Sequence, residues 1–282
     1  MKMKSLFLLL LLTILLPLSA FSEDPKATSK DSTKDGTSDA KKAGQKPLGL
    51  EQVLAKYYEA IGGLEKWRKL DTMIIQGAIN SQEKSMPMTA YHQRPNKCRV
   101  EYRVKETMMA QVYGGFFAWQ INPLSGNPEP APMTTGKTNY MRDTCDIENS
   151  LIDYKKKGYD VKLIGEEKIN GKNNYKIGVK YKSGNLETYY IDAQTFLITK
   201  SAGIYNFDGN EVRTTTNFSR YKKTNGYVVP YLLVIEIHGA PGENEWEISK
   251  FAFNAKIDPN IFEFPKDKII NMQKKEEIEP KN

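Results

Sequence analysis

Cysteine and histidine are scarce in this sequence, and their scarcity excludes several classes of protein. The 282-residue chain has only 2 Cys and 2 His. Two cysteines cannot hold together a small disulfide-rich domain or form a four-cysteine zinc site. The two histidines, His92 and His238, leave little scope for a histidine-rich metal centre. We therefore expect no metal and no cofactor. The length of the chain allows one large domain or two ordinary ones.

Motifs of known active sites are also missing. The sequence has no G-x-S-x-G, H-E-x-x-H, G-x-x-x-x-G-K-[ST] or G-x-G-x-x-G pattern. A nucleophile needs a base beside it, but no serine, cysteine or carboxylate motif surrounds His92 or His238. Glu166 and Glu167 are adjacent, so on a strand they would point to opposite faces. We expect a protein without enzymatic activity, since a hydrolase would have to depend on one of the two histidines.

Long hydrophobic runs are confined to the first 22 residues, which resemble a secretory signal peptide. Lys2 and Lys4 precede an apolar run over residues 6–16, and Ser22 is a small residue suited to a cleavage point. The run is short for a membrane span, which needs about 20 residues. We therefore expect cleavage after about Ser22 rather than an uncleaved anchor. No cysteine near this point could accept a lipid, and no later segment is long and apolar enough to span a membrane. The expected product is therefore soluble and not an integral membrane protein.

Large apolar side chains are lacking in two further segments. Residues 23–47 are rich in Lys, Asp, Ser, Thr, Gly and Ala, and such a segment cannot bury enough apolar surface to offset the entropy of ordering. We interpret it as a disordered charged tether, and residues 266–282 as a flexible tail. The predicted folded domain is then residues 48–265.

Positive charge is in modest excess and is not clustered. The formal charge of +7 falls to +5 when Lys2 and Lys4 leave with a signal peptide. No group of Lys and Arg interleaved with aromatic residues appears. We therefore expect no nucleic-acid partner.

Two helices are predicted in the folded domain. Apolar residues recur at helical spacing at its start, and they are Leu50, Val53, Leu54, Tyr57 and Ile61. Gly62-Gly63 would end this helix, and residues 64–70 would form a short further turn. Residues 137–157 predict a second helix, inserted midway along the chain. Asp258 and Pro259 favour a final short helix over residues 258–262.

Most of the remaining chain alternates apolar and polar residues, as half-buried strands do. The pattern is clean over residues 98–105, and Asn170-Gly171 is a strong hairpin signal. Residues 122–135 contain four prolines and predict a loop. The fold predicted is mainly β (α+β), an incomplete antiparallel β-barrel of about ten to eleven strands. It would wrap around the N-terminal helix and the inserted helix.

Cys98 lies on a predicted strand and Cys145 in the inserted helix. In an exported chain the two could form a disulfide. It would close a loop of about 47 residues, worth about 3–4 kcal/mol of unfolding free energy if unstrained, and it would hold the helix over the sheet. Two buried free thiols are the alternative, and the sequence leaves both open.

The concave face of a half-closed sheet is ordinarily a packed core, but it could also enclose a cavity. Methionine, which is flexible and suits irregular apolar contacts, is concentrated on the early strands. An acyl chain needs only apolar area, at about 0.8 kcal/mol for each buried CH₂. The candidate cavity residues for a bound lipid are Met73, Ile75, Met88, Val100, Met108, Phe116, Trp119, Leu233 and Ile235.

Five segments, taken in order, resemble the LolA-like family of outer-membrane lipoprotein-sorting and periplasmic lipoprotein-carrier proteins. The resemblance covers most of residues 50–265, and the segments are Ala60–Trp67, Arg94-Pro95-Asn96, Tyr190–Leu197, Phe218–Lys222 and Asn254–Phe262. It implies an incomplete antiparallel barrel that holds acyl chains in an apolar cavity. In such carriers an Arg before a Pro-Asn step bonds to the helical lid and helps to keep it shut, and the matching residue is Arg94.

The resemblance also implies a function and a location. We expect a soluble periplasmic carrier or binder of lipoprotein acyl chains or other lipid, which takes part in outer-membrane lipoprotein sorting. Membrane-bound release and acceptor proteins would be its partners. The alternative is an envelope sensory or interaction module that uses the same fold to bind a partner protein, with its interior filled by side chains.

Overall fold

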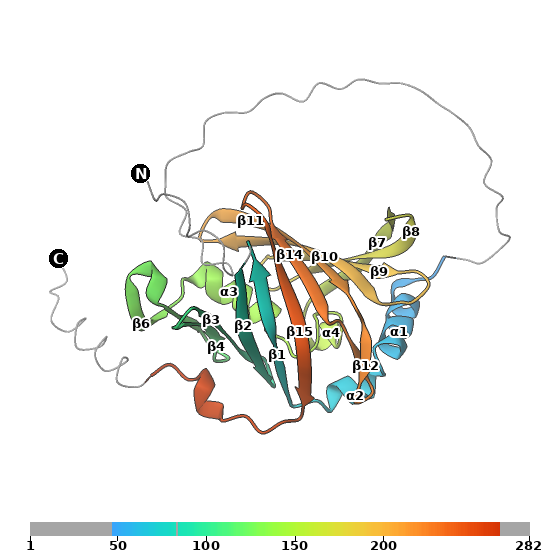
Figure 1. The fold of residues 1–282 in the computed structure, drawn as a ribbon. Helices are drawn as coiled ribbons and strands as arrows, with labels where there is room; N and C mark the ends of the chain where they lie inside the picture. Colours follow the sequence, from blue (N-terminus) through green and yellow to red (C-terminus); the bar gives the residue numbers. More distant parts are fainter. Residues whose placement is uncertain (1–46, 83, 266–282) are drawn as a thin grey trace, which may run out of the picture.

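A single open antiparallel sheet dominates the structure, as the sequence predicts (Figure 1). The computed structural model describes residues 47–82 and 84–265. The expected signal peptide and tail lie outside the described residues, as does the expected tether apart from Pro47. Thirteen strands form the main sheet and two more form a separate hairpin. The described residues thus hold more strands than the ten or eleven predicted.

The first six strands follow one another as a meander. They are β1 (Thr72–Ser81), β2 (Lys84–Gln93), β3 (Lys97–Val104), β4 (Thr107–Tyr113), β5 (Ala118–Asn122) and β6 (Asn127–Pro132). The last of these corrects the loop predicted for residues 122–135. Its prolines occupy alternate positions, 128, 130 and 132, while the N–H of Met133 points to the partner strand and donates to the Ala118 carbonyl. A strand at the edge of a sheet tolerates proline, because its outward positions need no N–H donor.

The remaining strands form the second half of the sheet. They are β7 (Asp160–Ile169), β8 (Lys172–Lys180), β9 (Leu186–Asp192), β10 (Ile198–Phe207), β11 (Asn210–Ser219), β14 (Leu232–Ile237) and β15 (Glu243–Phe253), with β12 (Lys222–Thr224) and β13 (Tyr227–Val229) as the separate hairpin. Strand β15 returns to pair with β1, which joins the two halves. The strand order therefore runs from β6 at one edge to β7 at the other.

Two helices precede the sheet, as predicted. Helix α1 (Leu50–Ala60) buries Val53, Leu54 and Tyr57, and helix α2 (Leu64–Arg68) buries Trp67. The Trp67 Nε1–H donates to the Ile61 carbonyl at 3.0 Å, so the two helices are held together at the turn between them. Figure 1 shows them at one end of the sheet, beside β9 and β12.

The chain between the two sheet edges, residues 133–159, forms the inserted segment. We predicted one helix over residues 137–157, but the structure has two, α3 (Thr135–Thr144) and α4 (Tyr154–Lys157). Residues 145–153 between them are irregular, and Leu151 and Ile152 are fully buried there. These two residues contact the core, and the stretch is hydrogen-bonded to Tyr57 and Tyr58 of α1 in place of regular helical hydrogen bonds. Helix α3 contacts β4, β5 and β10, and so it lies across the concave side of the sheet.

The C-terminal end of the described chain covers part of the outer face. The predicted short helix is present as a 3₁₀ helix, η2 (Pro259–Phe262), and the Asp258 side chain accepts the Asn260 N–H at 3.0 Å. Phe262 and Phe264 are buried against Val112 and Trp119 of β4 and β5. The early strands therefore bury apolar side chains on both of their faces.

Candidate functional site: a cavity inside the curved sheet

A cavity of about 420 Å³ lies between the concave face of the sheet and the inserted segment. This volume falls in the range of about 300–1,000 Å³ that is usual for ligand sites. Most of its lining is apolar, and the apolar side chains from the central strands include Met73, Ile75, Val100, Leu233, Ile235, Ile248 and Phe251. A smaller cavity of about 170 Å³ adjoins it and shares Trp67, Phe218 and Val229 with it. The interior of the half-barrel is therefore not filled by side chains alone.

The pairing of the strands shows how the sheet builds this wall. Residues directly opposite one another in neighbouring antiparallel strands share a face. The register pairs Tyr189 with Ser201, Ser201 with Thr216, Thr216 with Ile235, and Ile235 with Asn244. All five line the cavity. Polar groups therefore cross an otherwise apolar wall in a row that Ile235 interrupts. We call Ser201, Thr216 and Asn244 the polar row.

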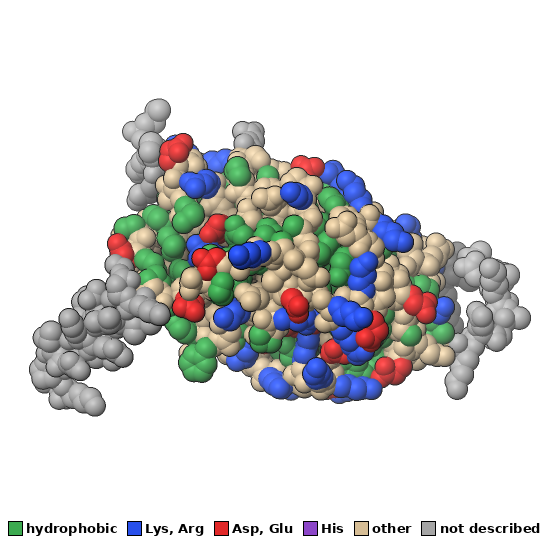
Figure 2. All heavy atoms as spheres, turned by 90° about the horizontal axis from the view of Figure 1, so that it is seen from below, with side chains coloured by type: hydrophobic (Ala, Val, Ile, Leu, Met, Phe, Trp, Pro, Cys, Tyr) green, Lys and Arg blue, Asp and Glu red, His purple; other side chains and the backbone are tan. Residues whose placement is uncertain are grey.

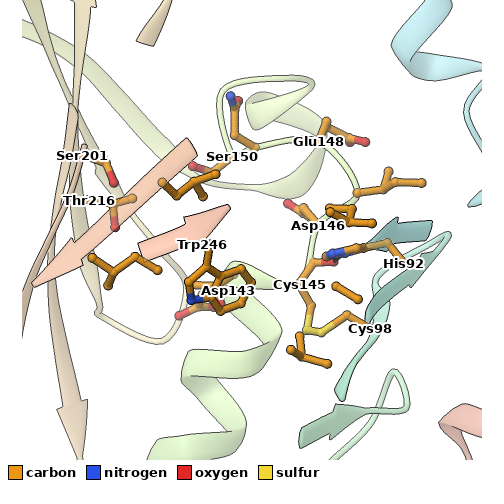
Figure 3. A pocket seen from close by; sticks show the side chains of 18 of the residues that line it. His92, Cys98, Asp143, Cys145, Asp146, Glu148, Ser150, Ser201, Thr216 and Trp246 are labelled. Carbon is orange, nitrogen blue, oxygen red and sulfur yellow. Dashed lines mark hydrogen bonds between the residues drawn. A yellow bond between two sulfur atoms is a disulfide. The ribbon is translucent and has the colours of Figure 1, made fainter. Parts of the chain in front are cut away.

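The inserted segment forms the opposite wall and brings acidic residues to it. Figure 3 shows Asp146, Glu148 and His92 facing Ser201 and Thr216 across the pocket. The acidic side chains of the lining are Asp143, Asp146, Glu148 and Glu187. Among the described residues, no Lys or Arg is part of the lining.

Arg94 holds the inserted segment at the end of β2. Its Nη2 lies 2.7 Å from Glu148 Oε2, and the Glu148 side chain is only 3% exposed. The same guanidinium donates to the carbonyls of Trp67 and Leu70, at 2.8 and 2.7 Å. Lys157 lies 3.0 Å from Glu148 on its other side. Arg94 therefore joins the sheet, the end of α2 and the inserted segment in one contact set.

Burial changes the proton affinity of the acidic wall. It raises the pKa of Asp146 to about 6, although Lys157 lies 2.8 Å away and opposes this shift. It also raises the pKa of Glu187, which accepts hydrogen bonds from the hydroxyls of Tyr181 and Tyr189. These carboxyl groups are consequently easier to protonate than exposed ones.

The two histidines lie in different surroundings, and only His92 lines the cavity. His92 Nδ1 lies 3.3 Å from the Cys145 carbonyl, and burial lowers the pKa of the ring. His238 is exposed, with Nε2 at 2.9 Å from the Thr215 hydroxyl. No group of three or more His, Cys, Asp or Glu able to hold a metal occurs in residues 47–82 and 84–265. The cavity therefore offers an enclosed, mostly apolar space for binding.

The nine predicted cavity residues divide into three groups. Met73, Ile75, Val100, Leu233 and Ile235 line the cavity, and the structure brings them together from β1, β3 and β14. Met88 is buried in the main core beyond the cavity lining. The other three lie elsewhere. Trp119 packs on the outer face under η2. Phe116 is 90% exposed in the turn before β5. Met108 alternates with the buried Met109 and so points away from the core.

Cys98 and Cys145 form a disulfide in the structure. It joins β3 to the end of α3, and both residues line the cavity (Figure 3). The bond ties the inserted segment to the first half of the sheet, while Gly136 at the start of α3 lies against the second half. A Cβ at Gly136 would come 2.6 Å from the Asp208 backbone nitrogen, so only glycine allows this approach.

Two parts of the site were not predicted from the sequence. They are the acidic side chains of the inserted segment and the polar groups of β15 that face the cavity. Asp146 and Glu148 lie two residues apart in the segment that was predicted to be a helix. This spacing gave no reason to expect an ion pair between Arg94 and either of them. Asn244 and Trp246 also lie two residues apart, and a period-two pattern could have placed them on one face. The pattern could not show that this face is the concave one.

The surface shows no single basic region on the face seen in Figure 2, where Lys and Arg side chains are interspersed with acidic and apolar ones. Among the described residues, no helix has the length and apolar character that crossing a membrane requires.

Comparisons with known proteins support the fold. A LolA superfamily protein of Nitrosomonas europaea matches 79% of this chain and 100% of its own, with 14% identity and a TM-score of 0.54. An outer membrane lipoprotein-sorting protein domain of Vibrio parahaemolyticus matches 79% and 97%, with 13% identity and a TM-score of 0.54. A DUF1329 family protein of Desulfovibrio piger matches 75% and 97%, with 17% identity and a TM-score of 0.51.

The sequence comparisons are narrower. A model of a family described as an uncharacterized protein matches residues 135–265. No curated protein matches the chain. The structural likenesses confirm the expected LolA-like fold, and at these identities they concern the fold alone.

Proposed function

We propose that this protein is a carrier that holds an acyl chain of a lipid or lipoprotein in the cavity inside its sheet, and that it is not an enzyme. The observation that carries the proposal is the apolar cavity of about 420 Å³ beneath the inserted segment. An acyl chain would gain about 0.8 kcal/mol for each CH₂ that it buries there. Binding of this kind requires no reactive group.

The inserted segment would act as the lid of this carrier, with Arg94 as its latch. It crosses from one sheet edge to the other over the cavity. The contact between Arg94 and Glu148 joins it to the strand beneath. A carrier that shields a chain from water must also release it, and we propose that membrane-bound release and acceptor proteins act on this lid.

We also propose that the protein is exported and acts in the periplasm, in lipoprotein sorting. The signal-like residues 1–22 support export. The disulfide between Cys98 and Cys145 supports an oxidising compartment. The carrier fold shared with the sorting-protein domain of Vibrio parahaemolyticus supports the process.

Native mass spectrometry of protein extracted gently from the cell envelope tests the carrier proposal. The wild-type protein is expected to retain lipid or acylated peptide. The variant Ile235→Trp fills the cavity and should lose it, whereas Ile164→Trp, at a side chain that is 54% exposed, should retain it. Reproducible absence of any bound lipid in the wild type would overturn the proposal and favour a sensory or interaction module.

A further inference from the structure

Two polar atoms in the cavity wall have neither a hydrogen-bond partner nor an ion-pair partner among the described residues. They are Asn244 Oδ1, an acceptor, and Trp246 Nε1, a donor. Asn244 is 6% exposed, and both residues line the cavity from the same face of β15. A buried polar group without a partner is costly, and native proteins leave few of them. An acyl chain alone would leave both atoms unpaired.

Further hydroxyl groups lie on the same wall. Thr216 faces Ile235, which in turn faces Asn244, so the Thr216 and Asn244 side chains emerge on the same concave face with strand β14 and Ile235 between them. Ser201 adjoins Thr216 on the next strand, and Figure 3 shows the two side by side. The polar row thus continues from the unpaired atoms of β15 toward Tyr189 and Glu187.

The charge of the wall restricts what could pair with these atoms. The lining holds four carboxyl groups and, among the described residues, no cationic side chain. Arg94 and Lys157 reach Glu148 from outside the lining. A phosphate or carboxylate in the cavity would face acidic groups without a cation to stabilise it. An uncharged group avoids this repulsion.

We propose that the cavity recognises an uncharged hydroxyl or amide group of the bound amphiphile, which donates to Asn244 Oδ1 and accepts from Trp246 Nε1. This inference rests on the proposed carrier function and adds a specificity subsite to it. A hydroxyl and a secondary amide each donate and accept, whereas a methyl ester accepts only. The polar row would give the group further hydroxyl partners.

The test is displacement of an uncharged probe, the methyl ester of a fluorescent fatty acid, from the full chain by four amphiphiles with the same oleoyl chain. Monoolein supplies hydroxyls, N-methyl oleamide an amide, methyl oleate no donor, and oleate a charge. We expect at least one of monoolein and N-methyl oleamide to displace the probe at roughly fivefold to tenfold lower concentration than methyl oleate. Oleate should be the weakest of the four. Stronger displacement by monoolein would indicate a hydroxylated lipid, and stronger displacement by N-methyl oleamide would indicate an amide-linked acyl chain.

Three variants make the test specific. Asn244→Leu and Trp246→Phe should bring the preference over methyl oleate to within about twofold. Asn217→Leu, an equal change on the exposed outer face of β11, should keep it. Because Asn244 Oδ1 is unpaired, Asn244→Leu should leave the melting temperature of the lipid-free protein unchanged or raise it. A structural role for Asn244 would lower that temperature instead.

The outcomes separate the two proposals. Equal displacement by monoolein, N-methyl oleamide and methyl oleate would overturn the subsite and leave the carrier standing. A preference that survives Asn244→Leu, or a marked loss of stability in that variant, would also overturn the subsite. Failure of the probe to bind, together with absence of lipid in the native mass spectrum, would overturn both.

Discussion

The ion pair between Arg94 and Glu148 should contribute to stability, because the Glu148 carboxylate is almost fully buried. Removing one member of a buried ion pair costs about 3–5 kcal/mol, since the other charge is left unpaired. We expect Arg94→Met to lose stability on this scale, reduced by the remaining contact of Glu148 with Lys157. The measurement is the free energy of unfolding in urea.

A double variant separates the ion pair from the loss of packing. Arg94→Met with Glu148→Gln removes both charges, so we expect it to regain part of the stability that Arg94→Met loses. Lipid release should be faster in both variants than in the wild type if Arg94 latches the lid. An unchanged free energy of unfolding in Arg94→Met would show that the pair contributes little.

Asp146 makes the stability of the protein depend on pH. Its pKa is raised to about 6 in the folded protein from an ordinary value of 3.8, so the folded state binds the proton more tightly than the unfolded state. Stability from this group is therefore present at low pH and is lost as pH rises from about 4 to about 6. Ionisation of Asp146 costs roughly 1–3 kcal/mol above that range.

The prediction concerns the difference between two proteins, so that other titrating groups cancel. Asp146→Asn cannot ionise, and its melting temperature should exceed that of the wild type at pH 7.5. The difference should shrink toward zero at pH 4, where Asp146 is protonated. Melting curves at several pH values provide the measurement, and a difference that grows as pH falls would contradict it.

At the scale of elements, the inserted segment is where the sequence was least informative. Its irregular stretch, residues 145–153, is fixed by contacts to distant residues. Tyr58 donates to the Leu151 carbonyl, and Ser150 donates to Tyr189. No local propensity encodes such contacts, and one continuous helix was consequently predicted over residues 137–157 where the structure has two. The hairpins and α1 were predictable because their signals are local.

The only disulfide within the described residues joins this segment to the sheet. It closes a loop of 47 residues, and the loss of such a tie is expected to cost about 3–4 kcal/mol. We predict that Cys98→Ser with Cys145→Ser lowers the free energy of unfolding by this amount and speeds exchange of bound lipid. Treatment of the wild type with a reductant should reproduce both effects, and an unchanged exchange rate would argue against the segment acting as a lid.

At the scale of the whole molecule, which face of each strand lines the cavity could not be predicted. Trp119 and Val100 were both predicted to line the cavity, yet one packs under η2 and the other lines the cavity. Alternation identifies two faces, but η2 makes both faces of the early strands apolar. Leu233 and Ile235 of β14 line the cavity, and β14 bears no such cover among the residues described.

The two halves of the sheet depend on each other through the pairing of β1 with β15, which the predicted chain order could not reveal. Residues 133–265 expressed alone would leave β15 as an unpaired edge, with Trp246, Ile248 and Phe251 uncovered on the apolar side. Such an edge favours aggregation. We expect this fragment to aggregate, or to lack a cooperative thermal transition by circular dichroism.

Co-expression of the two halves is the matching control. Residues 47–132 supply β1 and Cys98, so together with residues 133–265 they can rebuild the central pairing and the disulfide. The two fragments should therefore be recovered as one soluble complex that melts cooperatively, and a non-reducing gel should show them linked. A soluble, cooperatively folded monomer of residues 133–265 alone would mean that the second half of the sheet is an independent domain, and that β1 merely covers its edge.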